Sequence, residues 1–69
     1  MTDTKALYRA ISRNGYLKKF VAAQIGLSYQ GFLNKAHNRS EFTASEIEKL
    51  KALLHLSNKE RNNIFFFGS

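Results

Sequence analysis

Two side-chain amides, Gln30 and Asn34, stand four residues apart near the middle of the chain. Residues with this spacing share one face of a helix, and if Phe32 points to the interior, both amides point away from it. An outward Gln or Asn can form a bidentate pair of hydrogen bonds with N6 and N7 of adenine in the major groove of DNA. The spacing therefore predicts that Gln30 and Asn34 contact DNA bases.

Tyr29 and Gly31 lie beside this pair of amides. The Tyr29 ring can pack on the edge of the core and offer only its hydroxyl group to DNA, so we expect either a base contact or a structural role. Gly31 either keeps side-chain bulk away from the DNA or reflects crowding within the protein. The sequence alone leaves both alternatives open.

Four basic residues flank the expected base-contacting face: Lys18, Lys19, Lys35 and Arg39. Lys18 and Lys19 open a helix whose backbone N–H groups already favour a phosphate. Contacts of this kind set affinity and register but carry no sequence preference. We expect these side chains to contact the DNA backbone, with solvation of each as the alternative.

The charge is unevenly distributed along the 69 residues of the chain. Residues 1–40 hold seven Lys or Arg against one acidic residue, a net charge of +6, whereas the remainder holds four of each sign. The whole basic excess therefore lies in the half that contains the outward amides. A basic field on one part of a small domain is typical of a protein that binds a polyanion.

A pair of short helices has to position these side chains. The first carries an apolar stripe with a spacing of four residues: Leu17, Val21 and Ile25. Gly26 can take the left-handed conformation that ends this helix, and Ser28 can cap the next one. We therefore predict a helix-turn-helix whose second helix runs from about Tyr29 to Ala36.

Three further helices are expected around this pair. The first runs from roughly Asp3 to Asn14. It carries an outward stripe of basic residues that we expect to be solvated; the alternative is that one of them contacts a phosphate. The members of that stripe are Lys5, Arg9 and Arg13. A fourth helix begins at a capping box, Thr43 to Glu46, and a short fifth helix begins at a second box, Ser57 to Glu60.

The chain closes with an apolar run, Ile64 to Phe67. In a strand, Ile64 and Phe66 would face one side and Phe65 and Phe67 the other, so that one pair could seal the core and leave the other pair to a partner. We therefore predict that this tail contributes to a homodimer contact through Ile64, Phe65, Phe66 and Phe67.

Catalysis is not expected from these residues. The chain has no cysteine, and His37 and His55 have few carboxylates with which to build a metal site. Neither paired acids nor a Gly-rich phosphate loop is present in the sequence. We therefore expect no enzymatic activity, no cofactor or metal, and no small-molecule ligand.

The length of 69 residues, with no internal repeat and no proline, predicts one domain over residues 1–69. The longest apolar run is too short to span a membrane, and the N-terminal segment lacks the apolar core of a signal peptide. We therefore expect a cytoplasmic protein.

The chain resembles the lambda-repressor-like, or Cro/C1-type, helix-turn-helix family. The resemblance is carried by Val21, Ala22, Ile25, Gly26, Leu27, Ser28 and Phe32. Within the family it is most similar to small Cro-like regulators of phages and prophages of Gram-positive bacteria, which carry strings similar to GLSYQGFLNK and TASEIEKL and a closing IFF. The resemblance implies a compact all-α fold of four or five helices with a short apolar C-terminal tail.

The same resemblance implies the contacts that such a fold would make. Base contacts fall on Tyr29, Gln30 and Asn34, and backbone contacts on Lys18, Ser28, His37 and Arg39. A protein of this kind would be a transcriptional regulator of the Cro type, a repressor that binds double-stranded DNA as a homodimer with the helix of residues 28–36 in the major groove. It would act in the cytoplasm of a bacterial cell and associate with the nucleoid when bound to DNA. The alternative is a protein-interaction module of the antirepressor type, which would bind another repressor.

Overall fold

The computed structural model describes residues 1–66, which form five α-helices and no strand. The helices are α1 (Thr4–Arg13), α2 (Lys18–Gln24), α3 (Tyr29–Ala36), α4 (Ala44–Leu53) and α5 (Asn58–Phe65). Within the described range, no helix has the length and apolar content needed to cross a membrane. The predicted all-α class is confirmed.

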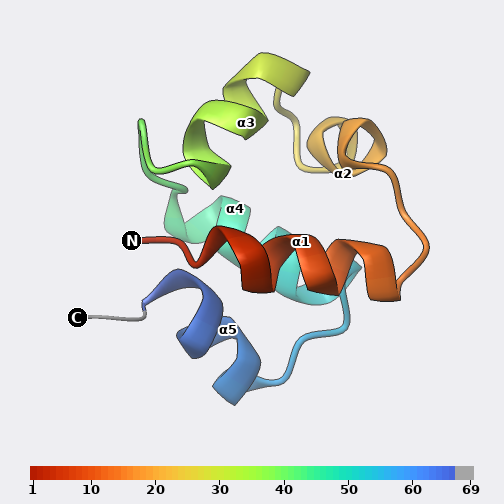
Figure 1. Cartoon of the computed structure of the whole chain (residues 1–69), viewed down its shortest axis with the longest axis vertical. Coiled ribbons are helices and arrows are strands. Elements are labelled where there is room, and N and C mark those ends of the chain that lie inside the picture. The colour runs from red at the N-terminus through yellow and green to blue at the C-terminus, as the bar shows by residue number, and fades with distance from the viewer. Residues whose placement is uncertain (67–69) are drawn as a thin grey trace.

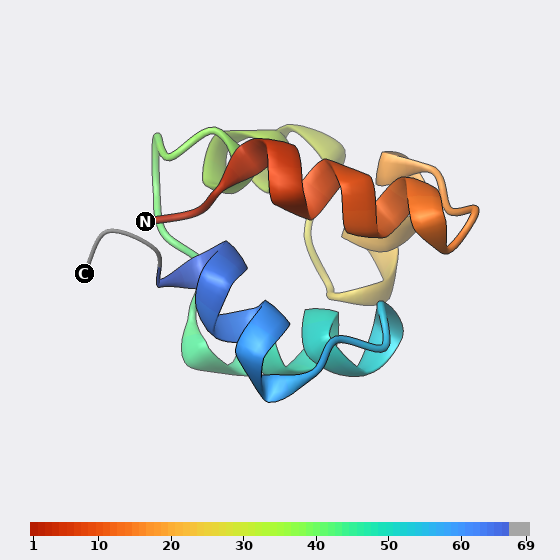
Figure 2. The ribbon, with the colours of Figure 1, turned by 60° about the horizontal axis from the view of Figure 1, so that its bottom comes forward.

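The helices are arranged around α1, which lies across the middle of the molecule with α2 and α3 on one side and α5 on the other (Figure 1). Turned by 60°, the molecule shows α4 and α5 together below α1 and α3 (Figure 2). In agreement with these views, α1 contacts α2 and α5, α2 contacts α3, and α4 contacts α5. The start of α1 and the end of α5 lie side by side, because the Asp3 N–H donates to the Ile64 carbonyl oxygen over 2.6 Å.

Side chains cap the starts of α1, α4 and α5. Asp3 accepts a hydrogen bond at the start of α1. Both predicted capping boxes are present: Thr43 with Glu46 and Ser57 with Glu60 each exchange side-chain to backbone hydrogen bonds. Such caps satisfy N–H groups that have no partner within the helix, so these three helix starts are defined by local sequence.

Leu17, the first residue of the predicted apolar stripe, does not belong to the buried face of α2. Val21 and Ile25 are buried, but Leu17 is 75% exposed. Leu17 precedes α2 with an extended backbone, at a φ of −88° and a ψ of 148°, so its side chain does not continue the helical stripe. Because the leucine side chain has no hydrogen-bond acceptor, α2 also begins without a side-chain cap.

The core lies where the five helices meet. Its largest fully buried side chains are Leu7, Ile11, Val21, Phe32, Leu50 and Leu54. Phe42, in the loop before α4, packs its ring against Phe32 and Phe65, with centroid distances of 6.0 and 5.6 Å. These three rings connect α3 to α5 through the loop.

The tail is helical rather than extended up to Phe65. Ile64 and Phe65 are only 4% and 3% exposed, so the predicted homodimer contact does not fit either of them. Consecutive helical side chains point about 100° apart, which lets both enter the core around the end of α5. Phe66 is 46% exposed, and Phe67 lies outside the described residues.

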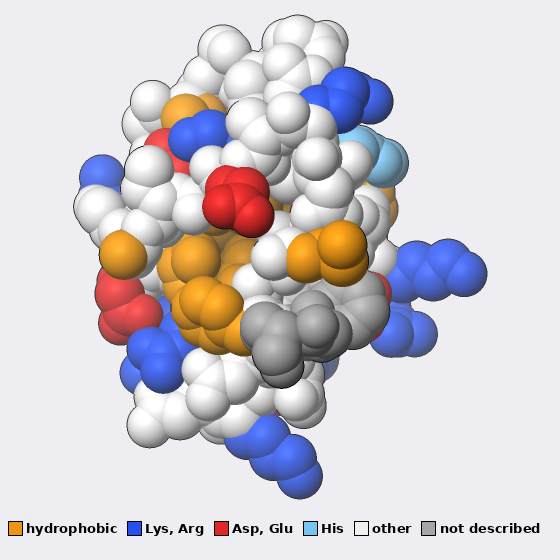
Figure 3. Space-filling model, turned by 90° about the vertical axis from the view of Figure 1, so that its left-hand side faces the viewer, with side chains coloured by type: hydrophobic (Ala, Val, Ile, Leu, Met, Phe, Trp, Pro, Cys, Tyr) orange, Lys and Arg blue, Asp and Glu red, His pale blue; other side chains and the backbone are white. Residues whose placement is uncertain are grey.

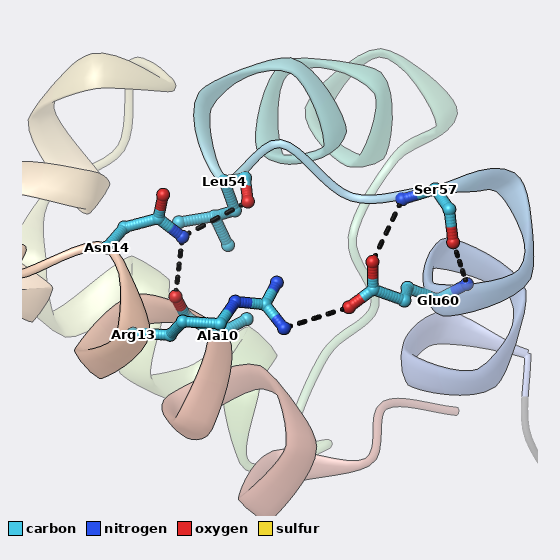
Figure 4. A network of polar contacts seen from close by, with 6 residues as sticks. All are labelled: Ala10, Arg13, Asn14, Leu54, Ser57 and Glu60. Carbon is cyan, nitrogen blue, oxygen red and sulfur yellow. Dashed lines mark hydrogen bonds and ion pairs between the residues drawn. The ribbon is translucent and has the colours of Figure 1, made fainter.

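A polar network joins the end of α1 to α4 and α5 (Figure 4). Asn14 Nδ2 donates to the carbonyl oxygens of Ala10 and Leu54, over 2.7 and 3.1 Å. Arg13 donates to Glu60 over 3.0 Å. The hydrogen bond from the Ser57 N–H, followed by that from Arg13, holds the pKa of the Glu60 carboxyl below its usual range. Glu60 therefore both caps α5 and connects this helix to α1 through Arg13.

Candidate nucleic-acid interface

The turn between α2 and α3 sets the direction of α3. Gly26 has a φ of 80°, in the left-handed region that favours glycine. The Leu27 N–H then donates to a carbonyl oxygen of the last turns of α2 over 2.9 Å. Ser28 Oγ caps α3 by accepting from the Gly31 N–H over 3.0 Å. The predicted bounds of this helix, Tyr29–Ala36, are confirmed.

Packing within the protein explains why a residue without a side chain stands at position 31. A Cβ at Gly31 would lie 3.0 Å from Ser28 Oγ, the atom that caps α3. A larger residue would displace this hydroxyl group or move the helix start. The distance supports the crowding alternative for Gly31.

The two amides of α3 lie on its outer side. Phe32, the side chain expected to point to the interior, and Ala36 are 0% exposed and mark the inner side. Gln30 is exposed and Asn34 is half-buried. Gln30 Nε2 donates to Asn34 Oδ1 over 3.0 Å, so the structure brings the two predicted base-contacting amides together.

Arg39 folds back onto the end of α3. Its Nε donates to Asn34 Oδ1 over 3.0 Å, and its backbone N–H donates to the Asn34 carbonyl oxygen over 2.8 Å. Arg39 thus lies beside the amides rather than extending away from them. The predicted backbone-contacting arginine and a predicted base-contacting residue are in direct contact.

Basic side chains lie around this face. Within residues 1–66, no carboxylate is in ion-pair contact with Lys18, Lys19 or Arg39: the four glutamates pair with other groups, and Asp3 caps α1. Lys18 Nζ lies 4.1 Å from the centroid of the Tyr8 ring, a cation–π contact that holds its charge at the start of α2. These positive charges are available to an anionic partner.

Tyr29 is 42% exposed and lies at the edge of the same surface. It lines a hollow together with Tyr8, Tyr16 and Lys18. Burial raises the pKa of the Tyr8 hydroxyl, and the neighbouring Tyr29 adds to this effect, whereas Arg39 opposes it. Tyr8 therefore stays neutral at physiological pH. The partial exposure of Tyr29 is compatible with both of its predicted roles.

Lys35 faces α4 instead of the outer side of α3. Its Nζ donates to both carboxylate oxygens of Glu46, over 2.7 and 2.9 Å, and the two side chains are 18% and 14% exposed. Burial by itself would raise the pKa of the Glu46 carboxyl, but hydrogen bonds from Lys35 and Thr43 outweigh it, and the pKa is lowered. A contact of Lys35 with a phosphate would require this ion pair to open.

The N-terminal segment holds the end of α3, a role that sequence reasoning missed. Asn38 has a φ of 66°, and its side chain exchanges two hydrogen bonds with the backbone of Thr2, over 2.7 and 2.9 Å. The Thr4 hydroxyl donates to the Ala36 carbonyl oxygen. An asparagine directly after a helix is a signal for the left-handed conformation, but nothing local in the sequence points to Thr2 as its partner.

The two histidines have different surroundings. His37 Nε2 is 2.8 Å from the Tyr8 hydroxyl, at the end of α3 and close to the basic face. His55 follows α4 with a φ of 56°, a position that ends the helix. Among the described residues, no three His, Cys, Asp or Glu side chains gather as a metal site would require.

Comparison with known proteins gives no assignment, since no family model, no curated protein and no solved structure matches the chain. The function has to be inferred from the residues and their geometry.

Proposed function

We propose that this protein is a sequence-specific double-stranded DNA-binding protein and a transcriptional regulator. In this proposal, α2 and α3 form a helix-turn-helix, and α3 enters the major groove. One observation carries it: Gln30 and Asn34 form an amide pair on the outer side of α3, opposite the buried Phe32 and Ala36. Amides in such a position match the hydrogen-bonding edges of base pairs.

The charge around α3 supports the same proposal. Lys18, Lys19 and Arg39 have no acidic partner among residues 1–66. We assign backbone contacts to Lys18, Lys19, Ser28, His37 and Arg39, and base contacts to Tyr29, Gln30 and Asn34. Lys35 is assigned to holding α3 on α4, because its ammonium group is already bound to Glu46.

The proposed class is a Cro-like repressor with a lambda-repressor-like fold. The order of five short helices, with the glycine turn between α2 and α3, supports this fold. A repressor of this type occupies its operator in the bacterial cytoplasm. Its activity would be controlled by its own concentration or by competition with another repressor for shared operators.

We further propose that two copies bind DNA together. A helix-turn-helix covers one half-site, and a two-fold pair fits half-sites about one helical turn apart. Hydrophobic side chains gather on the face shown in Figure 3. Phe66, at the end of α5, keeps an exposed fraction of 46%. Since Ile64 and Phe65 belong to the core, Phe66 is the described tail residue that we assign to the dimer contact.

Selection on a pool of randomised DNA duplexes tests the proposal. The purified protein is incubated with the pool at near-physiological salt, and the bound fraction is sequenced. Enrichment of an inverted repeat supports a dimeric, sequence-specific regulator, and the spacing of its halves gives the docking geometry. A single enriched half-site supports DNA recognition without the dimer.

Absence of enrichment by a folded protein would overturn the proposal. That result would favour the other class, a module of the antirepressor type that binds a second repressor. The two classes also differ in salt dependence, since binding to DNA weakens steeply as salt rises.

A further inference from the structure

Asn34 accepts two hydrogen bonds at once on its side-chain oxygen. Gln30 Nε2 and Arg39 Nε both donate to Asn34 Oδ1, each over 3.0 Å. An amide oxygen has two lone pairs, so both acceptor positions of Asn34 are filled. The Asn34 side chain therefore has only its N–H groups left for a further partner.

Arg39 is held in this position by the protein itself. Its backbone N–H is bonded to the Asn34 carbonyl oxygen over 2.8 Å. The preceding residue, Asn38, is bound through its side chain to the backbone of Thr2, which is only 6% exposed. These contacts hold the backbone of Arg39 next to Asn34, within reach of the Asn34 side-chain oxygen.

We propose that Arg39 is a specificity-determining residue that acts by occupying the side-chain oxygen of Asn34. The inference rests on the proposed function, because it concerns the base that Asn34 would contact. A free asparagine pairs with adenine by accepting from N6 and donating to N7. Once its oxygen is occupied, Asn34 is a donor only: it can donate to N7 of adenine but cannot accept from N6. It therefore matches best the bases that present acceptors without a neighbouring donor, guanine through N7 and O6 or thymine through O4.

Gln30 can still both accept and donate a hydrogen bond. It uses one Nε2 hydrogen on Asn34 and retains Oε1 and a second N–H, the two groups that adenine requires. Two amides of the same chemical type thus acquire different preferences. The expected half-site carries adenine opposite Gln30 and guanine or thymine opposite Asn34.

A matched pair of variants separates this effect from charge. Arg39→Met removes the Nε–H donor and one positive charge, whereas Lys19→Met removes one positive charge from an exposed side chain of the same face. Asn34→Ala identifies the base pair that Asn34 contacts, as the position at which its selected motif loses preference. Each variant and the wild type are used in the duplex selection, and their thermal melting is compared to show that they are folded.

The expected result is specific to one base pair. Arg39→Met should lower the preference for guanine or thymine over adenine at the Asn34 position by about tenfold, because the freed oxygen can accept from N6. Lys19→Met should weaken binding to all duplexes and leave the motif unchanged. Adding Arg39→Met to Asn34→Ala should produce no further change at that position.

Three results would overturn the inference. A wild-type motif with adenine or cytosine opposite Asn34 contradicts the donor-only amide. Identical motifs for Arg39→Met and the wild type show that Arg39 acts through charge alone. If the wild type selects no motif, the proposed function fails and the inference fails with it, whereas the first two results leave DNA recognition intact.

Discussion

Lys35 and Glu46 form a doubly hydrogen-bonded ion pair between α3 and α4, with Nζ to oxygen distances of 2.7 and 2.9 Å. The same carboxylate accepts from the Thr43 N–H over 2.9 Å and completes the capping box of α4. One side chain thus begins α4 and fixes the helix that carries Gln30 and Asn34. The stability of the fold and the placement of the candidate interface depend on a common residue.

Replacing Glu46 with glutamine should lower the free energy of unfolding by about 1–2 kcal/mol, a value between those of exposed and buried ion pairs. Glutamine keeps an acceptor for the Thr43 N–H but loses the charge that holds Lys35. Glu48→Gln is the matched control, since Glu48 is 57% exposed in its pair with Arg61 and should lose less than about 0.5 kcal/mol. Urea denaturation measures both losses, and equal losses would contradict the role of the α3–α4 pair.

The stabilisation by Glu46 should disappear in acid. Its carboxyl has a pKa below the usual 4.5 in the folded protein, despite burial, because Lys35 and Thr43 donate to the charged form. A lowered pKa contributes stability that is complete above the unfolded value and is lost as the pH falls through the folded value. The difference in unfolding free energy between the wild type and Glu46→Gln should therefore be largest near neutral pH and shrink below pH 4.5. A difference that is the same at about pH 7 and about pH 3 would rule out this linkage.

Gln30→Ala should reduce affinity for the selected operator by about 1–3 kcal/mol and relax the base preference at one position. The side chain is exposed, so its removal should leave the melting temperature nearly unchanged. Titration of the preferred duplex and of its three variants at that base pair measures the effect. A uniform loss on all duplexes would show that Gln30 has no part in sequence preference.

Lys19→Ala should give the complementary result. Loss of one phosphate contact weakens binding to every sequence and reduces the slope of log K against log salt by about 1. Arg9→Ala is a suitable control, because this exposed arginine of α1 belongs to the stripe expected to be solvated. Binding measured over a range of salt concentrations should show the wild-type slope for the control. An unchanged slope for Lys19→Ala would remove Lys19 from the interface.

Features that depend on neighbouring residues were predictable from the sequence. The capping box of Thr43 and Glu46 and the left-handed Gly26 involve atoms within a few residues, and both predictions are confirmed. Once Phe32 is taken as the buried side chain, helical periodicity places Ala36 on the same side of the helix, and both side chains are buried. The outer face of α3 could be predicted for the same reason.

Partners from distant parts of the chain were not predictable in this way. Glu46 lies 11 residues after Lys35, and Thr2 lies 36 residues before Asn38. Either contact exists only because the helices pack as they do. For the candidate interface, sequence patterns predicted which side chains face outward but not that Arg39 would occupy the side-chain oxygen of Asn34. The DNA contacts themselves remain predictions.

Asn38 offers a test of how the end of α3 is held. Its φ of 66° is strained for most residues, and its side chain bonds the backbone of the buried Thr2. Asn38→Gly tolerates the backbone conformation but loses both hydrogen bonds, and should reduce the free energy of unfolding by about 1–2 kcal/mol. Asn38→Ala loses the same bonds and adds strain, so its loss should be larger by about 1 kcal/mol. Thermal denaturation of both variants separates the two contributions. Equal losses would show that backbone strain is unimportant here, and an undiminished stability of Asn38→Gly would show that the contact with Thr2 does not hold the end of α3.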